Sequence, residues 1–141
     1  MKNEVFLDTA FAIALSSPND YFHQQATLLA DQLQEAGTHL VTTRAVMLEI
    51  GNALSKQRYR HAAVKLLNAL KVDPNVEIIP LSEQLYERAF QFYGKYTDKE
   101  WGLTDCISFV VMQDRRISSA LTTDEHFRQA GFKALLREGA K

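Results

Sequence analysis

The sequence predicts an α/β fold in which helices cover both faces of a parallel sheet. Short apolar runs typical of buried strands alternate with longer stretches of helical periodicity, and this order favours parallel strands joined by helices. A hydrophobic content of 46% supports a sizeable core, and 23% charged residues support a polar surface. The length of 141 residues fits one domain over residues 1–141.

The first quarter of the chain predicts one strand and two helices. An apolar run predicts a short buried strand at residues 5–7, and residues 9–15 can form a helix that the following Ser-Ser-Pro-Asn turn ends. A longer helix is predicted over residues 20–36, with Asp20 as its N-cap and Gly37 as its stop. Its apolar residues recur at spacings of three and four, which indicates one buried face.

The middle of the chain continues the alternation. In order, the predicted elements are a strand at 38–42, a helix from 44 to about 57, a helix at about 60–71, a strand at 76–79 and a helix at 83–93. Thr43 and Ser82 are predicted N-caps, because their hydroxyl groups can accept a hydrogen bond from a free backbone N–H. Residues 94–102 are predicted to form a polar loop.

The last third of the chain contains the most apolar helix that the sequence predicts. Thr104 is its expected N-cap, and its interior is apolar on nearly every side, which predicts a central, buried position. A strand at 120–122, a short helix at 124–130 ended by Gly131 and a last strand at 132–136 follow. The sequence therefore predicts a sheet of four to five short strands.

Four carboxylates occupy positions where folding alone gives little reason for an acid. Asp8 and Asp124 come just after predicted strands, Asp105 precedes the apolar helix interior, and Glu49 lies inside the apolar run 46–50. An ionised carboxylate near apolar groups is costly unless a cation or hydrogen-bond donors compensate it, and these runs contain no matching Lys or Arg. Oxygen ligands favour Mg²⁺ or Mn²⁺ over zinc, and such a cluster typically serves attack on a phosphodiester.

The predicted topology allows these acids to meet. Ligands of parallel α/β sheets bind beyond the carboxyl ends of the strands, where Asp8 and Asp124 would lie. Asp105, near a helix N-terminus, can point to the same rim, whereas Glu49 reaches it only if its helix lies across the opening. Asp is also a common N-cap, so each aspartate alone could merely cap a helix, and Glu49 could be a solvated edge residue.

Composition limits the other kinds of site. The single cysteine, Cys106, excludes an internal disulfide and a multi-thiolate zinc site, and its apolar surroundings favour a buried core thiol. The histidines lack metal-motif spacing, and His126 is interpreted as incidental. No apolar run approaches the ~20 residues that span a bilayer, and the N-terminus has no signal-peptide profile, so we expect a cytoplasmic protein with no membrane contact. Without the four acids the net charge of −1 would become +3 (−1 + 4), which permits a polyanionic substrate.

Four motifs of the chain, in this order and spacing, resemble the signature of PIN-domain ribonucleases, most of all the VapC-type toxins of toxin–antitoxin pairs. They are Phe6-Leu7-Asp8-Thr9, Met47-Leu48-Glu49-Ile50-Gly51-Asn52-Ala53-Leu54, Leu103-Thr104-Asp105-Cys106 and Leu121-Thr122-Thr123-Asp124-Glu125-His126-Phe127. The resemblance implies a PIN-like three-layer α/β/α fold and an acidic pocket that binds Mg²⁺ or Mn²⁺. It also implies endonucleolytic cleavage of RNA by metal-activated water, leaving a 5′-phosphate and a 3′-hydroxyl.

The resemblance also assigns residues and partners. It gives Asp8, Glu49, Asp105 and Asp124 catalytic roles, with the three aspartates as metal ligands. Supporting hydroxyl groups would come from Thr9, Thr104, Thr122 and Thr123, and Glu125 could be a further acid. The implied substrate is a transfer, ribosomal or messenger RNA. The implied partners are an antitoxin, whose tail would lie near the acidic pocket and block it, and a second copy in a homodimer.

Candidate RNA contacts come from the basic and aromatic residues. Lys56, Arg58, Arg60 and Lys65 could bind phosphates, although such a run is more often a solvated helix end. Trp101 could be a platform for a base or could pack in the core. The pair Arg115-Arg116 could bind phosphates or contact the carbonyl groups that end its helix.

Three rival functions fit the sequence less well than a ribonuclease. An aspartyl phosphatase needs an Asp-x-Asp pair after the first strand, but residue 10 is Ala10. A receiver-like signalling domain needs paired acids near residue 8 and a late phosphate-facing Lys, which the sequence lacks. A catalytically silent PIN-like module that binds RNA or protein would have an incomplete set of acids, and here the set is complete.

Overall fold

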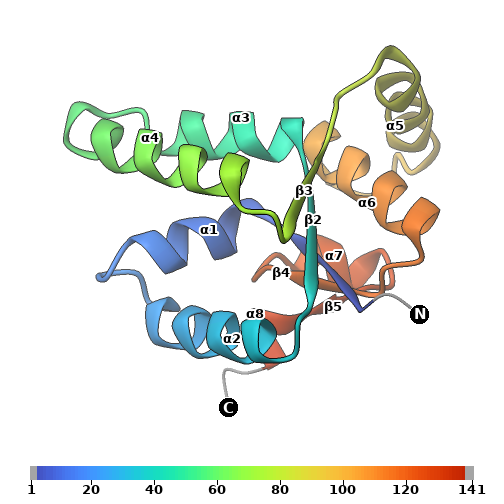
Figure 1. The fold of residues 1–141 in the computed structure, drawn as a ribbon. Coiled ribbons are helices and arrows are strands. Elements are labelled where there is room, and N and C mark those ends of the chain that lie inside the picture. Colours follow the sequence, from blue (N-terminus) through green and yellow to red (C-terminus); the bar gives the residue numbers. More distant parts are fainter. Residues whose placement is uncertain (1–2, 139–141) are drawn as a thin grey trace.

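The computed structural model describes residues 3–138 and contains a five-stranded sheet in which every pairing is parallel (Figure 1). Its strands are β1 (Glu4–Leu7), β2 (His39–Thr43), β3 (Val76–Ile79), β4 (Ser119–Leu121) and β5 (Lys133–Ala134). Their order across the sheet is β3-β2-β1-β4-β5, so the first strand lies in the middle. The predicted α/β class, with a parallel sheet of four to five short strands, is confirmed.

Eight helices surround this sheet within the described residues. They are α1 (Thr9–Ser16), α2 (His23–Glu35), α3 (Arg44–Ala53), α4 (Gln57–Val72), α5 (Glu83–Lys95), α6 (Leu103–Arg115), α7 (Glu125–Gln129) and α8 (Leu135–Glu138).

The helices form the outer two of three layers, as the alternation of β1 side chains shows. Val5 and Leu7 pack into a cluster with α1, α2 and α8, whereas Phe6 points to the opposite face and packs with α3, α6 and α7. The three-layer α/β/α arrangement is therefore confirmed. None of the helices in residues 3–138 combines the length and apolarity that crossing a membrane requires.

Helix α6 is the central element of its layer, as its sequence predicts. All seven residues from Cys106 to Met112 are buried, which confirms Cys106 as a core thiol. The predicted N-cap Thr104 is wrong, because the helix begins at Leu103 and Gly102 occupies the capping position. This shift places Asp105 in the first turn, where its carboxylate accepts a hydrogen bond from the Gly102 N–H at 3.1 Å.

Two other predicted N-caps are confirmed. The Thr43 hydroxyl accepts a hydrogen bond from the Val46 N–H at 3.1 Å, and the Ser82 hydroxyl accepts one from the Leu85 N–H at 3.1 Å. Gly37 adopts a left-handed backbone conformation with φ +67°, which agrees with its predicted role as a helix stop.

Four predicted boundaries are wrong. Asp20 is not an N-cap, because its carboxylate closes a turn with the Phe22 N–H at 2.9 Å and α2 begins only at His23. Helix α3 ends at Ala53 instead of about residue 57, and α4 begins at residue 57. The last predicted strand, 132–136, is reduced to Lys133–Ala134, because the chain then turns into α8 and buries Leu136 against the layer of α1 and α2.

Arg115 lies at the amino ends of the strands, far along the chain from its partners. Its guanidinium donates to Glu4 at 2.9 Å and to Glu77 at 2.7 and 3.0 Å. The predicted contact of Arg115 with the carbonyl groups of its own helix is therefore replaced by ion pairs that join the end of α6 to β1 and β3. The opposite end of the sheet, at the carboxyl ends of β1 and β4, carries the candidate site.

Candidate active site

Asp8 links the end of β1 to the start of α1 and is 6% exposed. Its Oδ2 accepts a hydrogen bond from the Thr122 hydroxyl at 2.7 Å, and it also accepts one from the Thr9 backbone N–H. Burial raises the pKa of this carboxyl to about 7, although these two hydrogen bonds oppose the rise, and the charges of Glu49 and Asp105 add to it. The carboxylate is therefore bonded across to β4, which argues against simple helix capping.

Glu49 reaches the same place from α3. Its Oε1 accepts a hydrogen bond from the Thr9 hydroxyl at 2.5 Å, which joins α3 to the first residue of α1. Because Thr9 directly follows Asp8 in the chain, this hydrogen bond brings Glu49 near Asp8, and the charge of Glu49 contributes to the raised pKa of Asp8. Helix α3 thus lies where the predicted convergence requires it.

Asp105 and Asp124 form the second half of the cluster, and His126 lies between them. The His126 Nδ1 is 2.9 Å from Asp105 Oδ2 and 3.4 Å from Asp124 Oδ1. Asp124 is also the N-cap of α7, since its Oδ1 accepts a hydrogen bond from the His126 backbone N–H at 2.9 Å. Asp124 is therefore both a helix N-cap and a member of the acid cluster.

The pKa values of Asp105 and His126 are both raised in this half of the cluster. Burial raises the pKa of Asp105; the hydrogen bond from His126 opposes the rise, and the charge of Asp124 adds to it. Partial burial acts to lower the pKa of His126, but the hydrogen bond to Asp105 and the charges of Asp124 and Asp105 outweigh it and raise that pKa. The four acids are therefore coupled through space, Asp8 to Glu49 and Asp105, and Asp105 to Asp124.

The threonines predicted to support the cluster differ in their contacts. The Thr122 hydroxyl donates to Asp8 and accepts from the Asp124 N–H at 3.0 Å, so it bridges two of the acids. Thr9 holds Glu49. Thr123 contributes its carbonyl, which accepts a hydrogen bond from Arg137, and Thr104 contributes its carbonyl to Ser108 at 3.2 Å. Within residues 3–138 the Thr104 and Thr123 hydroxyl groups make no hydrogen bond to an acid.

The donor set of the cluster fits a divalent cation. Within residues 3–138, no ion pair joins Asp8 or Glu49 to a Lys or Arg side chain. Two like charges 4 Å apart repel by about 4 kcal/mol at an effective dielectric of 20, so coupled carboxylates without a cation are unfavourable as they stand. Mg²⁺ or Mn²⁺ would supply the missing charge, and carboxylate oxygens are the ligands that these ions prefer.

Several predicted residues lie outside the cluster. Lys56, Arg58, Arg60 and Lys65 are exposed and lie between the end of α3 and the middle of α4. Arg60 donates to the Ser55 carbonyl at 2.6 and 3.1 Å. Glu125 forms ion pairs with Arg128 at 3.4 Å and Arg137 at 3.8 Å. The acid at 125 is thus paired with cations of its own surface.

The interpretation of Trp101 as a platform for a base is wrong. Its side chain is buried and packs against Phe92, Tyr96 and Phe109, with ring centroids 5.2 to 5.8 Å apart. Its Nε1 donates to Gln129 at 3.0 Å, which satisfies its polar group. A ring held on several sides in this way cannot stack on a nucleotide.

His126 is the residue of the site that the sequence analysis missed. The spacing of histidines along a chain reveals only zinc-like motifs, and His126 belongs to none of them. The useful signal was its position two residues after Asp124, because a helix N-cap holds the next turn close to its own carboxylate.

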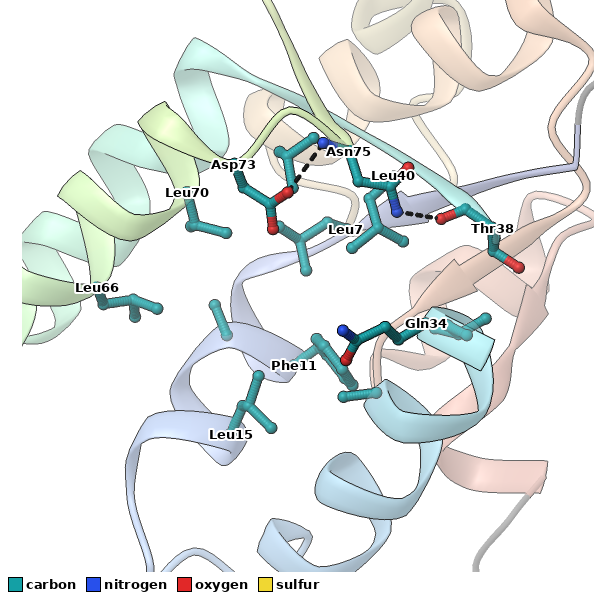
Figure 2. A pocket seen from close by; sticks show the side chains of 14 residues that line it. Leu7, Phe11, Leu15, Gln34, Thr38, Leu40, Leu66, Leu70, Asp73 and Asn75 are labelled. Atoms are coloured by element: carbon teal, nitrogen blue, oxygen red, sulfur yellow. Dashed lines mark hydrogen bonds between the residues drawn. The ribbon is translucent and has the colours of Figure 1, made fainter. Parts of the chain in front are cut away.

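A hollow of about 290 Å³, distinct from the acid cluster, lies between α1, α2 and α4 (Figure 2). Its lining is mostly apolar and consists of Leu7, Phe11, Ala12, Leu15, Ala30, Leu33, Gln34, Thr38, Leu40, Leu66, Leu70, Asp73, Asn75 and Val76. At its rim Asn75 donates through its side chain to the Thr38 carbonyl and through its backbone to Asp73. Leu7, which lines this hollow, directly precedes Asp8 of the acid cluster in the chain.

Comparison with known proteins agrees with this geometry. The model of the PIN domain family matches residues 5–133. The 23S rRNA-specific endonuclease VapC20 of Mycobacterium tuberculosis, from strains CDC 1551 and H37Rv, is 27% identical over 128 residues, which is 91% of this chain and 95% of the relative. These matches confirm the resemblance that the four motifs predict.

Two solved structures share the fold. The crystal structure of M. tuberculosis VapC20, described as a Sarcin-Ricin loop cleaving toxin, superposes with a TM-score of 0.79 at 26% identity and covers 91% of this chain and 95% of its own. FitAcB from Neisseria gonorrhoeae superposes with a TM-score of 0.63 at 18% identity, covering 92% and 94%. With the family model spanning nearly the whole chain, the protein belongs to the PIN domain family.

Proposed function

We propose that this protein is a metal-dependent endoribonuclease, the toxin of a type II toxin–antitoxin pair, which hydrolyses RNA phosphodiester bonds. The observation that carries the proposal is the meeting of Asp8, Glu49, Asp105 and Asp124, from four separate segments, with no Lys or Arg among their ion-pair partners in the described chain. The similarity to VapC20, which is named an rRNA endonuclease, supports the same activity.

The proposed roles follow from the contacts of each acid. Asp8, Asp105 and Asp124 would hold Mg²⁺ or Mn²⁺, which when bound polarises the phosphate and lowers the pKa of a water. Glu49 would orient the attacking water and accept its proton at a carboxylate oxygen. Thr9 keeps Glu49 at the rim, and Thr122 fixes Asp8 with respect to Asp124. Attack with departure of the 3′ oxygen would leave a 5′-phosphate and a 3′-hydroxyl.

The RNA would extend from the acid cluster along the surface of the α3–α4 connection. Lys56, Arg58, Arg60 and Lys65 are exposed there and would contact phosphates. The target RNA class is best approached through the relative, and a 23S rRNA fragment is therefore the first substrate to test, followed by transfer and messenger RNA.

The hollow between α1, α2 and α4 is the surface that we propose for the antitoxin. Its apolar lining suits the apolar face of a short amphipathic segment. Leu7 and Phe11 belong to the same β1–α1 unit as Asp8 and Thr9, so a segment seated there could continue toward the acid cluster and block it. A Leu33→Glu variant that keeps its cleavage activity but is no longer inhibited by the co-expressed antitoxin would support this assignment, and full inhibition would contradict it.

A homodimer is the oligomeric state that we propose. Leu48 on α3 and Tyr86 and Phe90 on α5 are exposed, and the rings of Tyr86 and Phe90 stack 6.3 Å apart. A hollow of about 310 Å³ beside them is lined in part by Leu48 and Glu49, so a second copy on this face would border the acid cluster. Light scattering of Phe90→Glu protein tests the surface, with a monomer as the expected result.

The decisive experiment compares Asp105→Asn with the matched control Asp98→Asn, which changes an exposed loop acid whose ion-pair partner is Lys99. Single-turnover cleavage of the rRNA fragment with Mg²⁺ should fall by at least about 100-fold in Asp105→Asn and stay unchanged in Asp98→Asn. Undiminished cleavage by Asp105→Asn would remove the mechanism. Metal binding by the wild-type protein without cleavage of any RNA tested would favour the alternative, a catalytically silent module that binds RNA or protein.

A further inference from the structure

The acid cluster has two halves of different chemistry that share Asp105. The half that contains Asp8 and Glu49 offers oxygen atoms only, whereas the other half consists of Asp105, Asp124 and His126, whose ligand atoms all lie within 4.8 Å of one another. We propose that the second half is a separate metal subsite in which the His126 Nδ1 is a ligand, and that this subsite takes Mn²⁺ in preference to Mg²⁺. The inference rests on the proposed function, which assigns Asp105 and Asp124 to metal binding.

The spacing of the three atoms matches one coordination sphere. The His126 Nδ1 is 2.9 Å from Asp105 Oδ2 and 3.4 Å from Asp124 Oδ1. Adjacent ligands of an octahedral ion with bonds of about 2.1 Å lie about 3 Å apart. A divalent ion can therefore be reached by all three atoms through side-chain adjustments, without a change in the backbone of α6 or α7.

The backbone hydrogen bonds leave each carboxylate oxygen a second lone pair that a metal ion could use. Asp105 Oδ2 accepts the Gly102 N–H at 3.1 Å, and Asp124 Oδ1 accepts the His126 N–H at 2.9 Å. Asp105 Oδ2 uses its other lone pair toward the imidazole Nδ1 at 2.9 Å, whereas the second lone pair of Asp124 Oδ1, 3.4 Å from Nδ1, is not used in a hydrogen bond to it. An ion in place of the Nδ1 proton would be bound by all three atoms while both backbone donors stay satisfied, which is the outer support that metal ligands usually have.

The nitrogen ligand determines which ion this subsite prefers. Mg²⁺ takes oxygen ligands and gives up its water reluctantly, whereas imidazole suits the later divalent metals and is accepted by Mn²⁺ more readily than by Mg²⁺. The half with Asp8 and Glu49 offers no nitrogen and has no comparable reason to discriminate. The two subsites should therefore differ in selectivity.

A second group with the same composition provides an internal control. Glu4, His39 and Glu77 also lie within 4.8 Å of one another through their ligand atoms. The guanidinium of Arg115 already binds both of these glutamates, at 2.9 Å and 2.7 Å, and holds the pKa of Glu77 down at about 2. Arg115 therefore already balances the negative charge of that group, and we assign no metal to it.

The test is pulsed electron paramagnetic resonance of Mn²⁺ bound to the full chain labelled with ¹⁵N-histidine. We expect a coupling to imidazole nitrogen in the wild-type protein and in His39→Ala, and no such coupling in His126→Ala. In calorimetric titrations, His126→Ala should lose at least about tenfold in Mn²⁺ affinity and less than about threefold in Mg²⁺ affinity. Far-UV circular dichroism checks that both variants are folded.

The outcomes separate this inference from the proposed function. Bound Mn²⁺ without nitrogen coupling in the wild-type protein overturns the role of His126 and leaves the carboxylate site intact. Nitrogen coupling that survives in His126→Ala but disappears in His39→Ala moves the ion to Glu4 and Glu77 and also overturns it. Failure of the wild-type protein to bind either ion would contradict the proposed function itself. If His126→Ala does not fold, the spectra of the wild-type protein and of His39→Ala together decide the question.

Discussion

The buried carboxyl of Asp8 makes a quantitative prediction about stability. Its pKa rises from 3.8 to about 7 on folding, and each pKa unit corresponds to about 1.4 kcal/mol. A carboxyl whose pKa is raised keeps its proton longer in the folded state, so its contribution is fully present below the unfolded pKa and is lost as the pH rises through the folded value. Between about pH 4 and pH 8, metal-free wild-type protein should lose about 4 kcal/mol of unfolding free energy through this one group.

Asp8→Asn removes that loss, because the amide cannot ionise. The amide oxygen can accept from Thr122 or from Thr9 but has less acceptor capacity than a carboxylate, so the variant is expected to be up to about 3 kcal/mol less stable than wild type near pH 4. The predicted quantity is the change across pH: the stability of the variant relative to wild type should increase by about 4 kcal/mol between about pH 4 and pH 8. Above neutral pH the variant should be the more stable protein.

Urea unfolding in EDTA, followed by circular dichroism at several pH values, measures this difference. Asp31→Asn, which changes an exposed acid on α2, is the matched control and should show a flat difference. Added Mg²⁺ should stabilise wild type by about 3 kcal/mol at a concentration 100 times Kd, and Asp8→Asn much less. A difference between Asp8→Asn and wild type that is the same at both ends of the pH range would refute the reasoning from burial and charge.

Three further predictions concern the neighbours of the site and the core. Thr122→Val leaves Asp8 without its hydroxyl donor and Asp124 N–H without an acceptor, so it should cost about 1–3 kcal/mol in urea unfolding at neutral pH, against less than about 0.5 kcal/mol for Thr123→Val. Arg115→Met should lower the free energy of unfolding by about 1 kcal/mol above pH 5. The ion pair holds the pKa of Glu77 low, so its stabilisation is present above the unfolded pKa of 4.5 and is lost as the pH falls toward about 2. Arg88→Met, which breaks a more exposed pair, should cost less. Trp101→Phe should lower stability by about 1–3 kcal/mol but leave the affinity for RNA in a filter-binding assay within about twofold, because the ring is buried. If Trp101→Phe protein unfolded at the same urea concentration as wild type but lost most of its affinity for RNA, Trp101 would contact RNA and this prediction would be wrong.

The elements predicted best are those that local chemistry determines. The strands around Phe6 and Ile78 are short, mostly apolar stretches bounded by polar or turn residues, and this length favours a strand over a helix. Thr43 and Ser82 are caps because each has extended backbone and a hydroxyl group directly before a segment of helical periodicity. The prediction of Thr104 as a cap was wrong because the sequence alone allows either Gly102 or Thr104 as the N-cap. The choice depends on the hydrogen bond from the Gly102 N–H to the Asp105 carboxylate.

The elements predicted poorly depend on contacts between distant segments. Residues 132–136 are apolar enough for a strand, but β4 pairs with only two of them, and the burial of Leu136 against α1 and α2 requires a helical turn. Trp101 has the same difficulty, since an aromatic side chain in a polar loop has no periodicity that distinguishes a core position from a surface position. The N-cap predicted at Asp20 is a further example, because Asp20 accepts a hydrogen bond from the Phe22 N–H in a turn and the helix begins only at His23.

The site was easier to predict than these boundaries for a physical reason. A buried carboxylate that contacts no Lys or Arg is unfavourable in any fold, so its presence in an apolar setting is visible before its neighbours are known. The convergence itself depends on two hydroxyl groups: Thr9 brings Glu49 to the start of α1, and Thr122 joins Asp8 to the segment of Asp124. Neither bond reduces the charge of the cluster. The fold thus holds four acids together by neutral donors and one imidazole, and an ion that supplies positive charge would stabilise the same arrangement that its chemistry needs.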